Sequence, residues 1–334
     1  MRSGRLTEGE RTDTALAGGK RAVRAESPPR VAYLGPEGTF SEEALLRSAE
    51  PGAVEPVPLA TIYDTVTALR RGDVEWAIVP IENSLDGSIS VTLDLLAGEA
   101  SDVEIVGETL LGVRHSLIAA TPLSLSEIET VISHPQVPGQ CAKFLRGELA
   151  HARILPAGST AEAVRSVARG GAPGQAALGT LLAAEIYGGV VIREAVQDRD
   201  DNETRFVWLA RAAPGADRSL ERPPLRTPQG AEWKTSLVFW GPGADSPGWL
   251  VRCLNEFARR GINLTKIESR PRRRQLGSYM FFADLAGRRD DVPLAEAIAG
   301  LRSICEQARV LGSYPAARQP RVGAGPPDTG PAGS

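Results

Sequence analysis

Cysteine and histidine are scarce in this chain of 334 residues, which contains three of each. The cysteines are odd in number and far apart, so they form neither a disulfide framework nor the spacing of a zinc site. The histidines do not cluster either. The positions are Cys141, Cys253, Cys305, His115, His134 and His151. We therefore expect a protein without a bound metal or other cofactor.

The chain also lacks long apolar runs and an excess of one charge. No apolar stretch is long enough to span a membrane, and residues 1–29 lack the apolar middle of a secretory signal. The formal net charge is −3, whereas phosphate binding needs a basic face. Hydrophobic residues make up 42% of the chain, which is enough for real cores. These properties predict a cytoplasmic protein that binds neither membranes nor nucleic acids.

Three stretches without apolar periodicity divide the chain. Residues 1–29 are polar and predict a disordered leader, and residues 316–334 predict a disordered tail. The proline- and glycine-rich stretch 212–232 predicts a linker. Two ordered blocks remain, residues 30–211 and 233–315.

The first block alternates short apolar runs with amphipathic segments. Residues 31–34 and 76–81 are apolar runs that predict strands. A following segment carries Ile62, Val66 and Leu69 at helical spacing. Repeated alternation of this kind favours an α/β fold with a largely parallel sheet.

Small polar residues follow the predicted strands just before the next helices. The junctions are GPEGTFS, IENSLDGS, SHPQ, GST and LGT. Each hydroxyl alone is an ordinary helix cap, but five such helix starts also offer free N–H groups that bind anions. Ligands of open α/β sheets bind at these strand ends. The block therefore predicts a site for a small, multiply anionic molecule. The glycine loop at 35–38 has neither the G-x-G-x-x-G spacing of dinucleotide-binding sites nor the lysine of a Walker loop.

The second block has the order βαββαβ, which is the ferredoxin-like unit. Its first helix carries Leu250, Leu254 and Phe257 on one face, and Gly261 follows as a cap. The block contains no group of residues that suggests catalysis. We therefore expect a regulatory or dimerising unit.

Seven stretches, in this order, resemble the prephenate dehydratases that carry a C-terminal ACT domain. They are YLGPEGTFSEEA (33–44), PIENSLDGSISVTLDLL (80–96), ISHPQVPGQCAKFL (132–145), STAEAV (159–164), AALG (176–179), DNETRFVWLAR (201–211) and GINLTKIESRP (261–271). The resemblance implies an enzyme that removes carbon dioxide and the ring hydroxyl from prephenate, giving phenylpyruvate for phenylalanine synthesis. It also implies a two-lobed, periplasmic-binding-protein-like catalytic domain with the active site in the cleft, and a ferredoxin-like ACT domain.

The resemblance identifies two catalytic candidates. Thr204, in the TRF motif, would donate its hydroxyl hydrogen to the departing oxygen, as a positioned donor or relay. Without the resemblance, a threonine at the start of a strand is better explained by a local backbone bond. Glu82 is the second candidate, either as the acid or as a residue that orients Asn83. His134 is an alternative acid, but Pro135 favours an extended junction and a structural role.

Nine residues are candidates for substrate binding. They are Thr39, Ser41, Asn83, Ser84, Ser133, Gln140, Ser159, Arg205 and Phe206. Neighbours in a strand point to opposite faces, so Arg205 either binds a carboxylate or pairs with Asp201 or Glu203 instead. Phe206 either packs against the substrate ring or belongs to the core.

Two elements of the second block resemble the family's phenylalanine-binding elements. They comprise Gly248, Trp249, Leu250, Glu268, Ser269, Arg270 and Pro271. The family usually has Ala or Ser where this chain has Trp249. The indole could fill the effector pocket, reshape it or point away. The resemblance implies feedback inhibition by L-phenylalanine and a homodimer or homotetramer.

Two other functions remain open at this stage. An arogenate dehydratase would act on the analogue in which an amine replaces the keto group. A non-catalytic sensor would bind prephenate or an amino acid without turnover, as many two-lobed folds do. The lack of a secretory signal argues against a periplasmic receptor, and Thr204 with the PIENS stretch argues against an inactive homologue.

Overall fold

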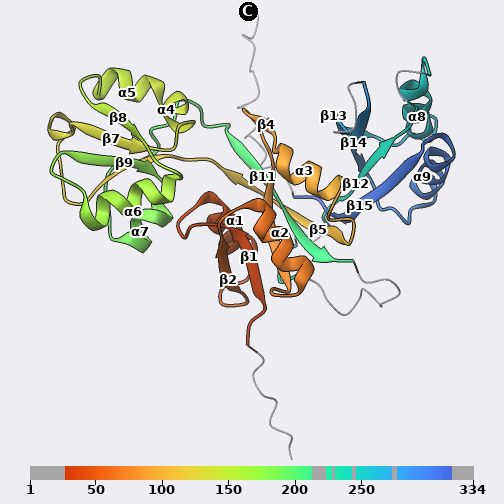
Figure 1. The fold of residues 1–334 in the computed structure, drawn as a ribbon, viewed down its shortest axis with the longest axis horizontal. Helices are drawn as coiled ribbons and strands as arrows, with labels where there is room; N and C mark the ends of the chain where they lie inside the picture. Colours follow the sequence, from red (N-terminus) through yellow and green to blue (C-terminus); the bar gives the residue numbers. More distant parts are fainter. Residues whose placement is uncertain (1–26, 213–222, 228–229, 243–245, 273–276, 318–334) are drawn as a thin grey trace, which may run out of the picture.

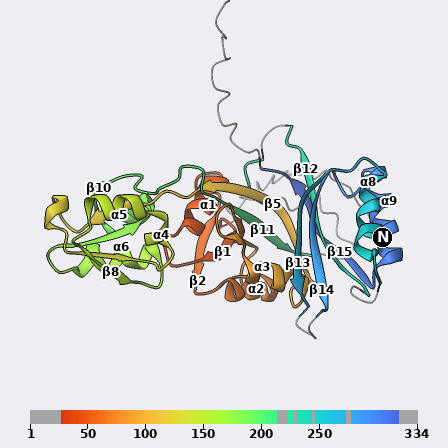
Figure 2. The same cartoon turned by 90° about the horizontal axis from the view of Figure 1, so that it is seen from above.

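The computed structural model describes residues 27–212, 223–227, 230–242, 246–272 and 277–317. Most of the predicted leader, linker and tail therefore lies outside the described residues. Within them, two lobes and a third unit follow one another in a row, with the first lobe in the middle (Figure 1). The same order is visible from above (Figure 2).

The first lobe is built on the strands that begin and end the first block. Its elements are β1 (Arg30–Leu34), α1 (Phe40–Ser48), β2 (Glu55–Leu59), α2 (Ile62–Arg71), β3 (Trp76–Asn83), β4 (Gly87–Ser88), α3 (Ser90–Ala97), β5 (Val103–Gly112) and β11 (Glu203–Arg211). Strand β1 pairs in parallel with β2 and β3, whereas β11 runs antiparallel to β3 and β5.

The second lobe has its own five-stranded sheet in the order β10-β6-β9-β7-β8. Its elements are β6 (Ser116–Ala119), the 3₁₀ turn Leu125–Glu127, β7 (Thr130–Ser133), α4 (Val137–Gln140), α5 (Ala142–Glu148), β8 (Arg153–Pro156), α6 (Thr160–Gly170), β9 (Gln175–Gly179), α7 (Leu181–Tyr187) and β10 (Val190–Arg193). The α/β class is confirmed. The expectation of largely parallel sheets was wrong, because both sheets are mixed.

The antiparallel pairs follow from the path of the chain. The chain leaves the first lobe along β5 and returns along β11, so these neighbouring strands run in opposite directions. The connections at 113–115 and 194–202 are the two crossings between the lobes. A cleft between two lobes joined in this way is expected beside the crossings, where β3 and β11 meet.

The third unit confirms the predicted βαββαβ order. It consists of β12 (Trp233–Trp240), α8 (Trp249–Ala258), β13 (Leu264–Pro271), β14 (Tyr279–Ala286), α9 (Val292–Ile304) and β15 (Gln307–Pro315). Its sheet, in the order β13-β14-β12-β15, continues the first lobe's sheet, because β15 pairs with β5 at Gly312 and Ile105. A Cβ at Gly312 would meet the Ile105 backbone oxygen at 2.1 Å, so this junction requires glycine.

The third unit packs firmly on the first lobe. Val238, Met280 and Phe282 of its sheet belong to the same apolar cluster as Leu96 and Ile105 of the lobe. The opposite face of this sheet is covered by α8 and α9, which form a separate core with it. The described helices include none that combines the length and apolar character needed to cross a membrane.

Candidate active site

Asn83, at the end of β3, connects the turn that follows this strand to the start of β11. Its Oδ1 accepts hydrogen bonds from the backbone N–H groups of Leu85 and Asp86, both at 2.9 Å, which fixes the turn after the strand. Its Nδ2 donates to Thr204 Oγ1 at 3.0 Å and to Asn202 Oδ1 at 2.8 Å. Asn83 is buried, and its bond to Asn202 is buried too, whereas the other three are part-buried. One amide therefore ties the PIENS turn to the TRF strand.

The Thr204 hydroxyl is oriented by this contact. Its oxygen accepts a hydrogen from Asn83, so its own hydrogen can be donated in another direction. Thr204 is half-buried near the start of β11, where it is paired opposite Asn83. A partly shielded hydroxyl with a fixed oxygen is suited to donate to a ligand in the cleft.

The network continues into the second lobe. Asn202 Nδ2 donates to Gln140 Oε1 at 3.4 Å, and His115 Nε2 lies 3.0 Å from the same oxygen. Since that oxygen only accepts, His115 Nε2 carries the hydrogen. Burial lowers the pKa of His115, and the Gln140 hydrogen bond offsets only part of this effect. A neutral His115 thus helps to position Gln140, and the side chains from Thr204 to His115 connect both lobes.

Three of the predicted hydroxyl residues, Thr39, Ser133 and Ser159, make local hydrogen bonds. Thr39 Oγ1 donates to the Leu34 carbonyl at 3.0 Å and caps α1, and Ser41 is buried in the first turn. Ser159 caps α6. Ser133 donates to the neighbouring carbonyl of His134 at 3.3 Å. These bonds explain why the residues are hydroxyls, and their role toward a substrate stays a prediction.

Ser84 bridges the PIENS turn to the returning chain. Its Oγ accepts from the Glu203 N–H at 3.0 Å and donates to the Asp201 carbonyl at 3.2 Å. Ser84 is exposed and lines the charged cavity that contains Arg205 and Glu82. The bridge adds a second tie between the turn and the TRF strand, beside that of Asn83.

Thr180 and Asn202 are site residues that the sequence analysis did not single out. Thr180 caps α7 and donates to the carbonyl of Gly38 at 2.7 Å, which joins the glycine loop of one lobe to a helix of the other. Tyr187 makes a second bond of this kind to Glu37 at 2.7 Å. The LGT junction was a signal for Thr180. The contact itself spans 142 positions and is invisible in the sequence.

Arg205 and Glu82 point away from Thr204, as strand alternation predicted for Arg205. Strand alternation places them on the opposite face, toward the third unit. Arg205 pairs with Glu82 at 3.2 Å and with two further carboxylates, not with Asp201 or Glu203. Asp201 pairs with Arg199 instead. Substrate binding by Arg205 and acid catalysis by Glu82 are therefore not supported by the geometry.

Phe206 belongs to the core. It is 2% exposed and packs in a cluster with Tyr33, Leu45 and Trp208 under α1. Phe206 lies on the same face of β11 as Thr204, two residues further along the strand, where α1 covers the sheet. Of the two roles considered for Phe206, core packing is the one that the structure has.

Comparison with known proteins gives a consistent result. The prephenate dehydratase family model matches residues 31–214, and the ACT domain model matches residues 243–303. A prephenate dehydratase of Mycobacterium leprae is 39% identical over 312 residues, covering 90% of this chain and 92% of that protein. The chain belongs to the prephenate dehydratase family. The resemblance inferred from the seven motifs is thus confirmed.

Two solved structures are similar across most of this prephenate dehydratase family member. The prephenate dehydratase of Arthrobacter aurescens in complex with L-Phe is 36% identical, with a TM-score of 0.74 and coverage of 88% and 93% of the two chains. A protein described as a novel type of quorum-quenching acylase is 30% identical, with a TM-score of 0.73 and coverage of 86% and 98%. The same fold is thus described with two activities.

The ACT domain of this family member holds Trp249 inside its core. The indole is 3% exposed, lies 6.1 Å from Phe239 and 5.8 Å from Phe281, and donates to the Ile304 carbonyl at 3.2 Å. The indole therefore points into the ACT domain, which excludes the possibility that it points away. Gly248 precedes it with φ +75°, a conformation that favours glycine.

The ESRP residues lie on two faces of β13. Ser269 is opposite Phe281, on the side of Trp249. Arg270 points to the catalytic domain, where it binds Asp94 at 2.8 Å and Ser90 at 2.7 Å, and Glu268 contacts Ser88. The predicted effector set is therefore divided between the helix-covered face and the domain interface.

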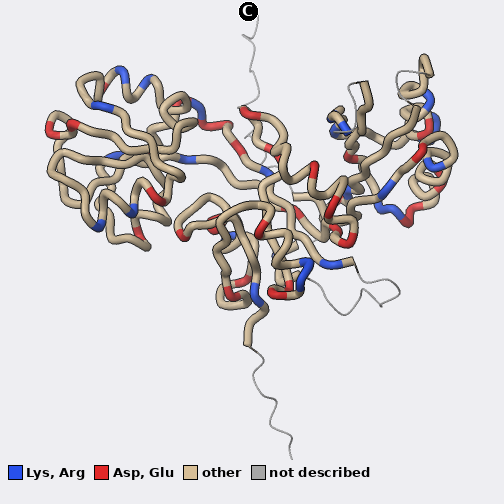
Figure 3. Tube along the Cα trace, in the orientation of Figure 1, with Lys and Arg blue, Asp and Glu red and all other residues tan. Residues whose placement is uncertain are grey.

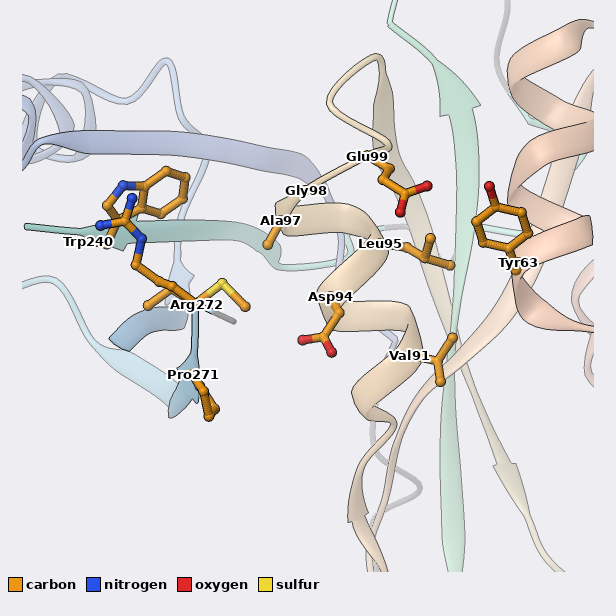
Figure 4. Close-up of a pocket in the computed structure, with 11 residues that line it drawn as sticks. Tyr63, Val91, Asp94, Leu95, Ala97, Gly98, Glu99, Trp240, Pro271 and Arg272 are labelled. Atoms are coloured by element: carbon orange, nitrogen blue, oxygen red, sulfur yellow. The ribbon is translucent and has the colours of Figure 1, made fainter. Parts of the chain in front are cut away.

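Two cavities lie between the ACT domain and the first lobe, beside their packed contact. One, of about 420 Å³, has Trp240, Pro271 and Arg272 on the ACT side and α3 residues such as Asp94 opposite them (Figure 4). Arg272 stacks on Trp240 at 4.8 Å. The second, of about 1180 Å³, surrounds Arg205 and is lined mainly by charged residues.

Proposed function

We propose that this chain is an active prephenate dehydratase in which Thr204 assists the departure of the ring hydroxyl. The carboxyl carbon–ring bond breaks and its electron pair aromatises the ring. The ring carbon–oxygen bond breaks at the same time, and the hydroxyl leaves with a proton as water. The products are carbon dioxide, water and phenylpyruvate. The hydrogen bond that Asn83 donates to Thr204 is the main support for this proposal. Because the Thr204 oxygen accepts this bond, the hydroxyl hydrogen of Thr204 can be donated to a ligand.

The chemistry requires a donor more than a base. Aromatisation supplies much of the driving force, whereas the hydroxyl leaves poorly unless its oxygen receives a hydrogen bond or proton. Thr204 is a weak acid, so it acts as a positioned donor or as a relay for a proton. Loss of one such donor typically lowers the rate by a factor on the order of 100 to 1,000.

The geometry at Thr204 does not favour an acylase mechanism. A nucleophilic hydroxyl needs an adjacent base that accepts its proton. The partner of Thr204 is the amide nitrogen of Asn83, which donates a hydrogen and cannot accept one. The 30% identical acylase therefore shows what the fold permits, while the site here is arranged for donation.

The proposal includes feedback inhibition by L-phenylalanine through the ACT domain. The matched ACT model and the L-Phe complex of the Arthrobacter aurescens relative support it. A thermal-shift titration tests it, with an increase in melting temperature expected at millimolar L-phenylalanine. An unchanged melting temperature in a fully active enzyme would exclude this form of regulation.

Self-association through the ACT domain is also proposed. Strand β13 is the outermost strand of the described sheet, and Ile267 on it is 44% exposed. Such an edge can pair with a second copy. The choice between homodimer and homotetramer, and the cytoplasmic location, remain predictions.

The function is tested by prephenate turnover in wild type, Thr204→Val and Thr204→Ser, with arogenate in parallel. Valine matches the shape of threonine without the hydroxyl, and serine retains the hydroxyl. We expect Val to lower kcat by roughly 100-fold or more and Ser by no more than about tenfold. A wild type that binds prephenate without releasing phenylpyruvate would support a sensor. Preference for arogenate would identify the alternative dehydratase.

A further inference from the structure

Arg205 joins the catalytic domain to the ACT domain. Its guanidinium lies 2.8 Å from Glu108 of β5 and 2.7 Å from Asp284 of β14, and it donates to Tyr314 of β15 at 3.0 Å. The side chains of Arg205, Glu108 and Asp284 are 9%, 1% and 9% exposed. Figure 3 shows acidic and basic positions mixed where the two domains meet. A single, largely buried catalytic-domain side chain thus contacts two ACT strands beside the larger cavity.

The charges around Arg205 are balanced. Lys234 binds Glu108 at 2.7 Å, and the Ser236 hydroxyl bonds to Asp284 at 2.5 Å. Burial by itself would lower the pKa of Arg205, but Tyr314, Asp284 and Glu108 raise it well above its ordinary value. Burial likewise opposes ionisation of Asp284, but Arg205 and Ser236 lower its pKa overall. The pair therefore remains charged at neutral pH.

Both terminal guanidinium nitrogens of Arg205 donate hydrogen bonds to protein groups, and the buried Nε has an ion-pair contact without hydrogen-bond geometry. Nε lies near Glu108, one terminal nitrogen is shared by Glu82 and Asp284, and the other donates to Tyr314. A substrate carboxylate would have to displace one of these partners. A structural task for Arg205 fits the arrangement better.

Strand pairing beside Thr204 is interrupted. Arg205 is opposite Glu82, but Phe206 is opposite Pro80, so Ile81 is an extra residue in β3. Pro80 also has no N–H to donate. The start of β11 pairs with β5 without interruption, but beside β3 only the pairs Thr204–Asn83 and Arg205–Glu82 and the Ser84 bridge precede the bulge, so side-chain contacts add to its position there. Those contacts are Asn83 to Thr204 on one face and the partners of Arg205 on the other.

We propose that Arg205 and the ACT residue Asp284 are positioning residues for Thr204. The ACT domain holds the Arg205 guanidinium and thereby fixes the start of β11. The Thr204 hydroxyl, on the neighbouring residue, then points into the cleft. This inference rests on the proposed role of Thr204. Misplacement of a reacting group by about 1 Å can cost on the order of 100-fold in rate, so a contact one residue away is expected to affect turnover.

Asp284→Asn tests the proposal, because it keeps the shape of the side chain and removes its charge. The matched control is Asp94→Asn, which removes the charge from another ion pair between the same domains, Asp94 with Arg270. We expect Asp284→Asn to lower kcat by roughly tenfold with KM within about twofold, as expected for partial misplacement. Asp94→Asn is expected to change kcat by less than about twofold, since its ion pair joins α3 to β13 and not β11 to β14.

A double-mutant cycle separates positioning from general destabilisation. Once Thr204→Val has removed the hydroxyl, Asp284→Asn should lower kcat by less than about twofold further. An equal tenfold loss in both backgrounds, or an equal loss in Asp94→Asn, would overturn the proposal. Circular dichroism and urea unfolding check the fold of each variant. If Asp284→Asn does not fold, Tyr314→Phe decides in the same cycle, with a loss of about threefold expected.

The cycle also distinguishes the proposed role of Thr204 from the positioning role of Arg205 and Asp284. Wild-type rates in Thr204→Val would refute the role of the Thr204 hydroxyl in the proposed function, and the positioning role with it. A slow Thr204→Val beside an unimpaired Asp284→Asn would leave the function standing and overturn only the positioning role.

Discussion

Asn83→Asp is expected to inactivate the enzyme without unfolding it. The substitution keeps Oδ1, which accepts the N–H groups of Leu85 and Asp86, so the turn should persist. It replaces the amide that donates to both Thr204 and Asn202 by a carboxylate that can only accept, so the link to Asn202 is lost as well. The Thr204 hydrogen would then point back to the protein instead of toward the leaving hydroxyl.

The size of the effect follows from that reversal. The leaving group loses its oriented donor, which typically costs on the order of 100-fold in kcat, or about 2.7 kcal/mol. The added negative charge also opposes a substrate with two carboxylates, so KM should rise as well. The two effects are separable, because only the first lowers kcat at saturating substrate.

The assay is steady-state release of phenylpyruvate from prephenate, with urea unfolding as a check of the fold. Asn255→Asp is the matched control, because Asn255 is exposed on α8 and the change adds the same charge. The control should retain wild-type kcat. A folded Asn83→Asp enzyme whose kcat is within about threefold of wild type would refute the role assigned to the Asn83 amide.

Two further predictions concern stability and redox chemistry. Burial lowers the pKa of His115 from its ordinary value of 6.5, so folding favours the neutral ring. Stability from this residue is complete above about pH 6.5 and is lost as the pH falls toward the lower folded pKa, by at most about 1.4 kcal/mol per unit. Urea unfolding between pH 5 and 8 should show this loss in wild type and not in His115→Gln; parallel profiles would contradict it. The Cys253 and Cys305 sulfurs are 3.7 Å apart, so mild oxidation should reduce the thiols titrated after denaturation from three to one. Cys305→Ser should keep both of its remaining thiols, and loss of Cys141 instead would disprove the assigned pair.

Local patterns were enough to predict much of the fold. Alternating apolar runs and amphipathic segments identify the α/β block, and the βαββαβ order of the ACT domain matches the structure. Strands β2, β4, β5 and β6 were not predicted. In β5, Glu104 and Glu108 interrupt the apolar pattern, and Glu108 is buried only because Lys234 and Arg205 neutralise it. Both partners are about a hundred residues away in sequence.

The site shows the same division. The sequence by itself determined the family, the TRF and PIENS motifs, and the alternation that separates Thr204 from Arg205, because these depend on neighbouring residues. Only the tertiary structure decided that Arg205 and Glu82 face the ACT domain, that Asn202 and Thr180 help to join the lobes, and that Trp249 lies in a core. A side chain's partner depends on which distant strands the fold brings beside it, and on whether burial makes an unpaired charge too costly.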